Sequence, residues 1–271
     1  MFPGATADRD AADYVVVGAP LDVSTTFQPG ARFGPDRIRR FARTYDDYDA
    51  RTDARFSELA VHDHGDVRAW DDAAEYLEYL EGVATDAVWD DAVPLLLGGE
   101  HTVTLAGVRA VDPDVFVCLD AHLDLRAEYD GNPLSHATVT RHVLEVAEEA
   151  VILGARTGSE EEWERAAESD VTVVPPEDAA DWTPDFDADE SVYLSVDIDG
   201  ADPGFAPGTG TMEPFGLTPR EMRDVVREVA ERGQVAGFDV VEVNDRDDGQ
   251  AAALGGKLLR EFVFSHADAS D

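Results

Sequence analysis

Acidic residues and histidines follow two short apolar runs of the chain. The run "VFVCL" ends at residue 119 and the run "VYLSV" ends at residue 196. The polar residues that come next are Asp120, His122, Asp124, Asp197 and Asp199. Because they are spaced two apart after each run, an extended backbone places their side chains on one face. Crowded carboxylates repel and raise one another's pKa, so such a cluster needs something that neutralises it.

Two further apolar runs end in groups suited to chemistry, one in Glu100 and His101 and the other in Glu242. In a parallel α/β sheet, ligands bind beyond the carboxyl ends of the strands. Four aspartates and two histidines at that edge predict a pair of divalent cations about 3.5–4 Å apart, sharing carboxylates and a water, as in many hydrolytic sites. A set rich in oxygen ligands with a few imidazoles favours Mn²⁺ over zinc or copper.

The elements that must position these groups can be read from hydrophobic periodicity. Near-continuous apolar, β-branched runs predict buried strands at 13–20, 93–101, 115–122, 150–156, 171–176, 192–200 and 237–244. Helices are predicted between them at 71–90, 102–110, 138–149, 160–168, 218–232 and 248–263. Two of these helices have capping boxes, Ser159 with Glu162 and Thr218 with Glu221. The alternation predicts one α/β domain over residues 1–271 with a mostly parallel sheet.

Three long irregular segments, at 19–35, 123–135 and 201–217, interrupt this pattern. Loops of this length in a compact domain are usually functional. His62 and His64 are predicted to lie in a loop at a strand end, and His142 and His266 at the surface. Glu100 is expected either to orient the metal ligands from behind or to cap the following helix.

Composition excludes several classes of partner. The chain has 59 acidic and 21 basic residues, a net charge of −38, and a single lysine, Lys257. Such a field repels nucleic acid and anionic membranes, and no apolar run approaches the roughly 18 residues of a membrane span. With no signal-peptide pattern and one cysteine, Cys118, predicted in the core, we expect a cytoplasmic protein adapted to molar salt.

The chain resembles the ureohydrolase family, which includes arginases and agmatinases, in six motifs that occur in the family's order. They are "LGGEHTVTL" (97–105), "DAHLDLR" (120–126), "GNPLSHATV" (131–139), "SVDIDGADP" (195–203), "GTGTMEPFGLT" (208–218) and "VEVN" (241–244). Two earlier segments, "GAPLDVSTTFQPGARFGPDRIR" (18–39) and "DHGDV" (63–67), are similar to the agmatinase pattern. The resemblance implies an α/β/α sandwich with about eight strands, and a homotrimer or homohexamer.

Carried over position by position, the resemblance also implies roles for single residues. One Mn²⁺ would be held by His101, Asp120, Asp124 and Asp197. The other would be held by Asp120, His122, Asp197 and Asp199. His136 matches the family's proton-shuttle histidine, and Glu242 matches the glutamate that binds the substrate's guanidinium.

The expected reaction is attack of metal-bridging hydroxide on a guanidinium carbon, which resonance makes a poor electrophile. Asp124 would relay a proton to the departing amine, His136 would exchange it with solvent, and the products would be urea and an amine.

The expected substrate is agmatine, a small cation, cleaved to putrescine. Contacts typical of arginases are absent, and Glu128 and Asp130 are expected to face a distal ammonium. Arg126 would instead favour an acid, so guanidinobutyrate, arginine, formiminoglutamate and aminopropylagmatine stay open. A catalytically silent metal-bound scaffold or regulatory subunit is the alternative of another class.

Overall fold

The computed structural model describes residues 1–68, 70–187 and 189–270. Its main feature is one eight-stranded sheet with the order β4-β1-β5-β10-β9-β6-β7-β8, in which every neighbouring pair is parallel. The strands are β1 (Tyr14–Ala19), β4 (Val61–Asp66), β5 (Val93–Gly98), β6 (Val115–Leu119), β7 (Glu149–Leu153), β8 (Val171–Val174), β9 (Ser191–Asp197) and β10 (Gln234–Val241). A separate short hairpin pairs β2 (Tyr48–Asp49) with β3 (Ala54–Arg55).

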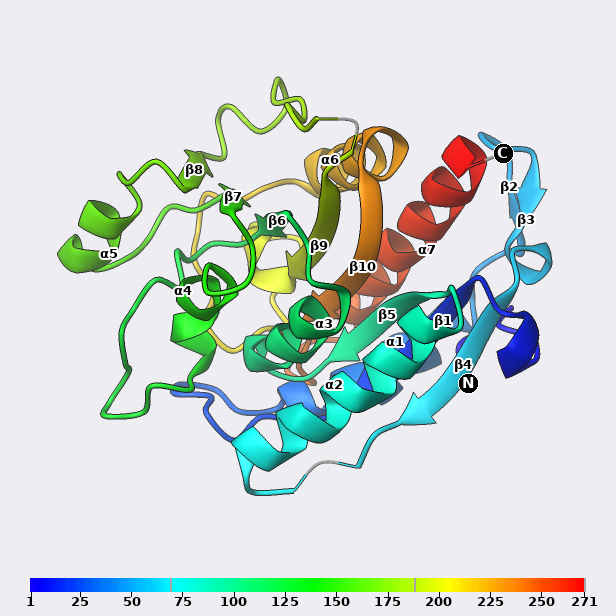
Figure 1. Cartoon of the computed structure of the whole chain (residues 1–271), viewed down its shortest axis with the longest axis horizontal. Coiled ribbons are helices and arrows are strands. Elements are labelled where there is room, and N and C mark those ends of the chain that lie inside the picture. The colour runs from blue at the N-terminus through cyan, green and yellow to red at the C-terminus, as the bar shows by residue number, and fades with distance from the viewer. Residues whose placement is uncertain (69, 188, 271) are drawn as a thin grey trace.

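Helices cover both faces of this sheet, as Figure 1 shows. They are α1 (Gly34–Ala42), α2 (Ala73–Trp89), α3 (Thr104–Val111), α4 (Val139–Val143), α5 (Glu160–Arg165), α6 (Pro219–Arg232) and α7 (Gln250–Ser270). One core cluster joins the sheet to α1, α6 and α7, and another joins it to α2, α3 and α4.

The strands are continuous apolar runs in the sequence because helices bury both faces of the sheet. In β6, Val115, Val117 and Leu119 enter the first core cluster, whereas Phe116 and Cys118 enter the second. This alternation follows from the two-residue period of a strand. The predicted α/β/α sandwich with about eight parallel strands is therefore confirmed, as is the burial of Cys118.

Strand β4, helix α1 and the short hairpin of β2 and β3 escaped the sequence prediction. His62 and His64 lie within strand β4, so their assignment to a strand-end loop is wrong. This edge strand buries only alternate positions at its start and carries polar residues, so it lacks a continuous apolar run. Helix α1 also went unpredicted, although Gly34 and Pro35 open it at positions where proline suits a helix start.

Other boundaries and positions differ in detail. The predicted helix 138–149 is too long, because α4 ends at Val143 and β7 begins at Glu149. His266 is not at the surface: it is half-buried on α7, stacks on Phe262 and bonds the Tyr14 hydroxyl at 2.8 Å. Both predicted capping boxes are present.

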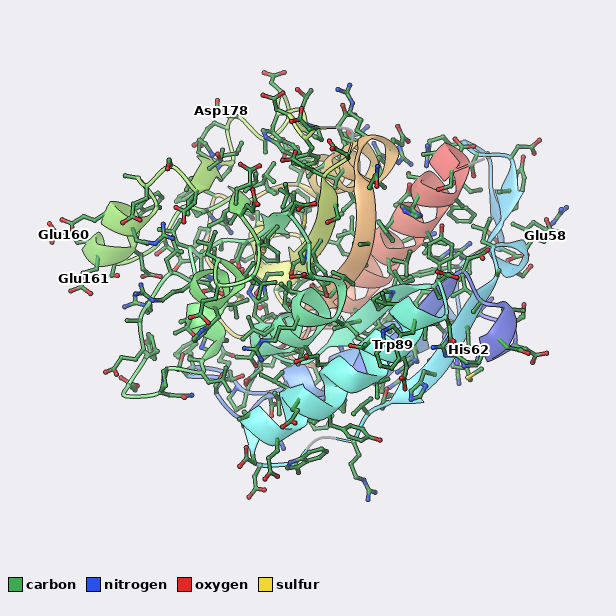
Figure 2. All side chains as sticks on the ribbon, in the orientation of Figure 1. Glu58, His62, Trp89, Glu160, Glu161 and Asp178 are labelled. Carbon is green, nitrogen blue, oxygen red and sulfur yellow. The ribbon has the colours of Figure 1, made fainter. Side chains whose placement is uncertain are left out.

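Many acidic side chains lie on the surface of the molecule. Figure 2 shows the carboxylates of Glu58, Glu160, Glu161 and Asp178 pointing outward, and all four residues are exposed. Across the described ranges, no helix combines the length and apolar character needed to cross a membrane.

Candidate metal centre

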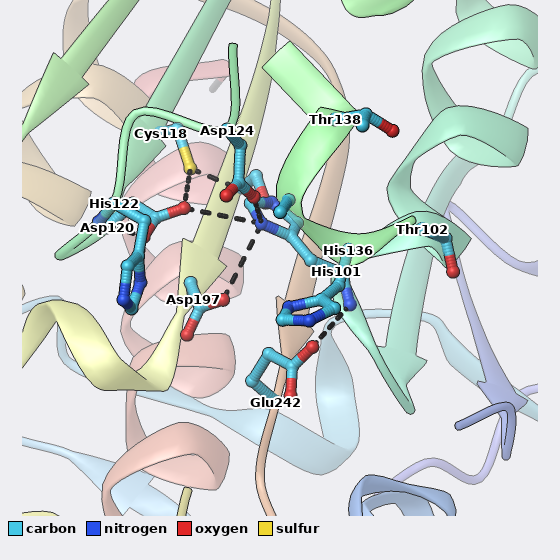
Figure 3. Close-up of polar contacts among 12 residues, drawn as sticks. His101, Thr102, Cys118, Asp120, His122, Asp124, His136, Thr138, Asp197 and Glu242 are labelled. Atoms are coloured by element: carbon cyan, nitrogen blue, oxygen red, sulfur yellow. Dashed lines mark hydrogen bonds and ion pairs between the residues drawn. The ribbon is translucent and has the colours of Figure 1, made fainter. Parts of the chain in front are cut away.

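The predicted ligands gather at one edge of the sheet, beyond the carboxyl ends of four strands that are neighbours in the order β5-β10-β9-β6. His101 lies in a 3₁₀ turn just after β5, and Asp120 comes directly after β6. Asp197 is the last residue of β9, and Glu242 comes directly after β10. Figure 3 shows these side chains converging from their separate strands.

His101 directs its Nδ1 atom at three carboxylates. That nitrogen lies 2.9 Å from Asp124 Oδ2, 3.3 Å from Asp120 Oδ2 and 3.5 Å from Asp197 Oδ2. All four side chains are buried. One imidazole and three carboxylates around a single point form a donor set suited to a divalent cation.

His122 forms the second group with the neighbouring carboxylates. Its Nδ1 atom lies 3.1 Å from Asp199 Oδ2 and 3.5 Å from Asp120 Oδ1. Asp120 therefore presents one oxygen to each histidine. Asp197 adjoins both groups, because its Oδ2 faces His101 while its Oδ1 accepts a hydrogen bond from the Asp199 amide at 2.8 Å. The donor set therefore fits two cations that share carboxylates.

Cys118 is adjacent to this set. Its Sγ atom is 3.8 Å from His101 Nε2 and 3.8 Å from Asp120 Oδ2, whereas the three carboxylates face Nδ1. Burial raises the pKa of the Cys118 thiol in the metal-free protein. The oxygen and imidazole groups form the better site.

Burial also perturbs the carboxylates. It raises the pKa of Asp124 to about 7, with the charge of Asp120 adding to the effect, and raises the pKa of Glu242 to about 8. Burial and the charge of Asp199 raise the pKa of Asp197 well above its ordinary value. Without cations the cluster thus retains protons, which divalent cations would displace.

The backbone at two of these positions is in the left-handed region. Asp124 has a φ of 52° and Glu242 a φ of 59°. Non-glycine residues adopt this conformation at a cost and mostly where the surrounding structure imposes it. Both residues lie beyond a strand end, and the carboxylate of each contacts His101.

Glu242 lies beside His101 as well as Asp197. Its Oε1 atom accepts a hydrogen bond from the His101 backbone amide at 2.8 Å, which fixes the carboxylate. A side chain at Gly210 would come within 3.7 Å of the other oxygen, Oε2. The glutamate is 3% exposed.

His136 approaches the cluster from a different segment. It begins a 3₁₀ turn that a Ser135–Thr138 capping box holds in place. Its amide donates to Ser24 Oγ at 3.0 Å, and its Nε2 atom is 3.0 Å from Thr26 Oγ1. Burial, and then the charge of His122, lowers the pKa of His136 to about 4.

A cavity of about 270 Å³ opens beside these groups. His122, Asp124 and His136 line it together with Thr26, Arg126, Tyr129, Ala137, Thr157, Gly158, Ser159, Glu162, Thr211 and Glu213. Glu242 is not in this lining. Arg126 pairs with Glu162 at 3.1 Å and lies 5.2 Å from the centre of the Tyr129 ring.

The structure corrects the expectation about the acidic residues of the cavity. Glu128 and Asp130 are exposed and are not among its lining residues, whereas Glu162 and Glu213 are. The sequence offered one signal for Glu213, namely its place in the glycine- and proline-rich segment 201–217 predicted to be functional.

Arg156, which sequence reasoning missed, holds that segment in position. Its guanidinium donates to the backbone carbonyls of Asp199 at 2.9 Å, Glu213 at 2.7 Å and Pro214 at 3.1 Å. It also donates to the carbonyls of Gly154, Gly200 and Ala201. One side chain thus ties the turn that contains Asp199 to the loop that brings Glu213 to the cavity.

Comparison with known proteins agrees with this arrangement. The model of the Arginase family matches residues 12–265. The chain is 37% identical to an N(1)-aminopropylagmatine ureohydrolase of Thermococcus kodakarensis, over 93% of this chain and 90% of that protein. It is also 37% identical to an agmatinase of Pyrococcus horikoshii, over 94% of this chain and 92% of that protein. The crystal structure of agmatine ureohydrolase of Thermoplasma volcanium is similar, with a TM-score of 0.93, 32% identity, and 99% and 94% of the two chains covered.

Proposed function

Because the chain belongs to the arginase family and is a hydrolase acting on guanidino substrates, we propose that it cleaves agmatine to putrescine and urea with two Mn²⁺ ions per subunit. The observation that carries the proposal is the pair of histidines that share Asp120. His101 and His122 each face this carboxylate with Nδ1, at 3.3 Å and 3.5 Å.

We assign the predicted ligands to two cations from the family resemblance, and the distances from His101 and His122 support the assignment. One cation would be held by His101, Asp120, Asp124 and Asp197, and the other by Asp120, His122, Asp197 and Asp199. When bound, the cations supply a strong nucleophile at mild pH by lowering the pKa of a water. The positive charge of the cations then keeps the buried carboxylates ionised.

Three residues act on the substrate in this proposal. Glu242, whose Oε1 is already fixed by the His101 amide, accepts N–H bonds from the planar guanidinium. Asp124, ionised in the loaded enzyme, would take a proton from the nucleophile as it attacks and give that proton to the departing amine. His136 would exchange protons between the cavity and solvent through its ring nitrogen, and it lines the cavity together with Asp124.

The charges of the cavity support a substrate with a distal cation. The cavity's one arginine, Arg126, is neutralised by Glu162 and covered by Tyr129, so it does not repel an ammonium. Glu213 supplies a further negative charge to the cavity lining, and this charge also acts on the nearby Arg156 guanidinium. We therefore transfer the role expected of Glu128 and Asp130 to Glu213. A substrate carboxylate at this place would lack a partner, at a cost of several kcal/mol.

The second candidate substrate is aminopropylagmatine. A relative of this chain at 37% identity bears that name, and its longer amine carries the same guanidinium and a distal cation. Glu213 would serve either molecule. The two substrates therefore differ in length and number of charges rather than in the chemistry that recognises them.

The test is urea release from agmatine, aminopropylagmatine, guanidinobutyrate and arginine by the manganese-loaded protein. We expect agmatine to have the highest kcat/KM. Glu213→Gln should lower the ratio of agmatine to guanidinobutyrate by about tenfold, because a charged hydrogen bond is lost only for the cation. If the parent protein has a higher kcat/KM for guanidinobutyrate than for agmatine, the agmatine proposal is wrong and Arg126 is the specificity residue. No urea from any of these substrates, together with no formamide from formiminoglutamate, would favour the silent scaffold.

We propose further that residues 1–271 form one domain and assemble as a homotrimer or homohexamer in the cytoplasm. The single eight-stranded sheet supports the first statement. The family's usual oligomeric state supports the second. Sedimentation velocity at high salt tests the assembly, and a monomer would contradict it.

A further inference from the structure

Glu100 is a buried carboxylate beside a metal-ligand candidate, but its bonds lead elsewhere. It is 0% exposed, and its oxygens accept hydrogen bonds from the Ser24 amide at 2.7 Å and the Thr25 amide at 3.1 Å. The hydroxyls of Ser24 and Thr102 also donate to it, each at 2.7 Å. It makes no side-chain cap for the turn that follows it. Neither role expected from the sequence is therefore its main one.

These bonds fix the loop after β1 against the loop after β5. Two backbone bonds join the same segments, from the Gly99 amide to the Ala19 carbonyl and from the Glu100 amide to the Leu21 carbonyl, each at 2.7 Å. A side chain at Gly99 would come within 1.8 Å of the Leu21 carbonyl oxygen, so only glycine permits this approach. A buried carboxylate is costly unless hydrogen-bonded. Residues 24 and 25 therefore must stay where they satisfy Glu100.

The loop fixed in this way contacts His136 at two points. The Ser24 hydroxyl accepts a hydrogen bond from the His136 amide at 3.0 Å while it donates to Glu100. Two residues later, Thr26 Oγ1 lies 3.0 Å from His136 Nε2. A continuous chain of bonds thus leads from Glu100 through Ser24 to the backbone of His136, and the same loop holds the imidazole.

We propose that Glu100 and Ser24 are positioning residues for His136, holding the loop 24–26 so that it fixes both the backbone and the ring of that histidine. His136 needs such support because it follows the long irregular segment 123–135 and sits on a turn of three residues. A proton carrier works only within hydrogen-bond reach of its partner. The inference rests on the proposed function, in which His136 exchanges protons.

The variant that tests it is Ser24→Ala. It removes the hydroxyl that joins Glu100 to His136 and leaves the two backbone bonds to Glu100 in place. The chain offers a matched control in Ser191→Ala at the opposite end of the sheet. The Ser191 hydroxyl also donates to a carboxylate, Asp114 at 2.9 Å, and accepts from a backbone amide, that of Asp114 at 3.1 Å. The two variants remove the same chemistry at different places.

We expect Ser24→Ala to lower kcat at least about tenfold with little change in KM, since general acid–base groups contribute about 10²–10⁴-fold. Manganese content should equal that of the parent, and the His136 amide should exchange faster with deuterium. Ser24→Thr, which keeps the hydroxyl, should restore both properties. Ser191→Ala should change neither.

The inference is overturned if Ser24→Ala matches Ser191→Ala in kcat and leaves exchange at His136 unchanged. It is also overturned if Ser24→Ala raises KM alone, because the loop would then contact substrate rather than position the histidine. Failure of the proposed function looks different: the parent itself would release no urea, while the exchange measurement would still report the link between Ser24 and His136.

Discussion

Glu242→Gln separates binding of the guanidinium from recognition of the rest of the substrate. The His101 amide donates to Oε1 of the glutamate at 2.8 Å. A glutamine keeps this bond only by placing its carbonyl oxygen there, so its NH₂ group takes the place of Oε2. A guanidinium presents only N–H donors, and it would then face another donor.

The magnitude follows from the bond that is lost. A hydrogen bond to a charged group contributes about 1.5–3 kcal/mol. At about 1.4 kcal/mol per tenfold, this predicts a loss in kcat/KM of roughly 10–150-fold. The same loss should occur for agmatine, aminopropylagmatine and guanidinobutyrate, because all three present the same guanidinium.

The assay is urea release with each substrate under manganese saturation, together with elemental analysis of the variant. Glu213→Gln serves as the control. It should change the ranking of substrates without the uniform loss in kcat/KM that Glu242→Gln causes for all of them. A Glu242→Gln enzyme within threefold of the parent would refute the role of this residue. A loss confined to one substrate would show instead that Glu242 recognises the distal end.

Three further predictions concern metal, pH and salt. Asp120→Asn should lose both cations and activity together, and elemental analysis finding one cation in a fully active parent would refute the binuclear site. In the metal-free protein, burial raises the pKa of Asp124 from 3.8 to about 7. The contribution of Asp124 to stability is therefore fully present below pH 3.8 and is lost as the pH rises through 7. The melting temperature in EDTA should fall over this pH range. The increase in melting temperature that added Mn²⁺ produces should become larger over the same range. A flat profile would contradict the shift. Because the net charge is −38, the melting temperature should rise with KCl up to molar levels, and indifference to KCl would mean that the acidic surface is not a salt adaptation.

The clustering of the candidate residues at one edge could be predicted because it did not depend on the order of the strands. Parallel strands place all their carboxyl ends at one edge, whatever their sequence in the sheet. His101, Asp120, Asp197 and Glu242 each follow a strand with a clear apolar run. The structure adds that these four strands are neighbours, which no local pattern contains.

The lining of the cavity could not be predicted in the same way. Glu128 and Asp130 are close to Asp124 in sequence, and this made them attractive, but their segment leaves them exposed. Glu213 reaches the cavity because Arg156, 57 residues earlier, holds its carbonyl. Such a contact joins two irregular segments, and neither periodicity nor propensity contains it.

Arg126 shows why an isolated side chain can mislead about specificity. From the sequence alone, an arginine two residues after a metal-ligand candidate suggests an anionic substrate. In the structure its charge is cancelled by Glu162. The Glu162 side chain also accepts a hydrogen bond from the Ser159 amide at 2.8 Å, and the Glu162 amide donates to Ser159 Oγ at 3.4 Å, and these two bonds form the capping box of α5. The same glutamate therefore begins a helix and neutralises the arginine, which ties the charge of the cavity to the position of α5. A change at Glu162 should then expose Arg126 and shift preference toward acids, whereas a change at Arg126 should shift it toward cations.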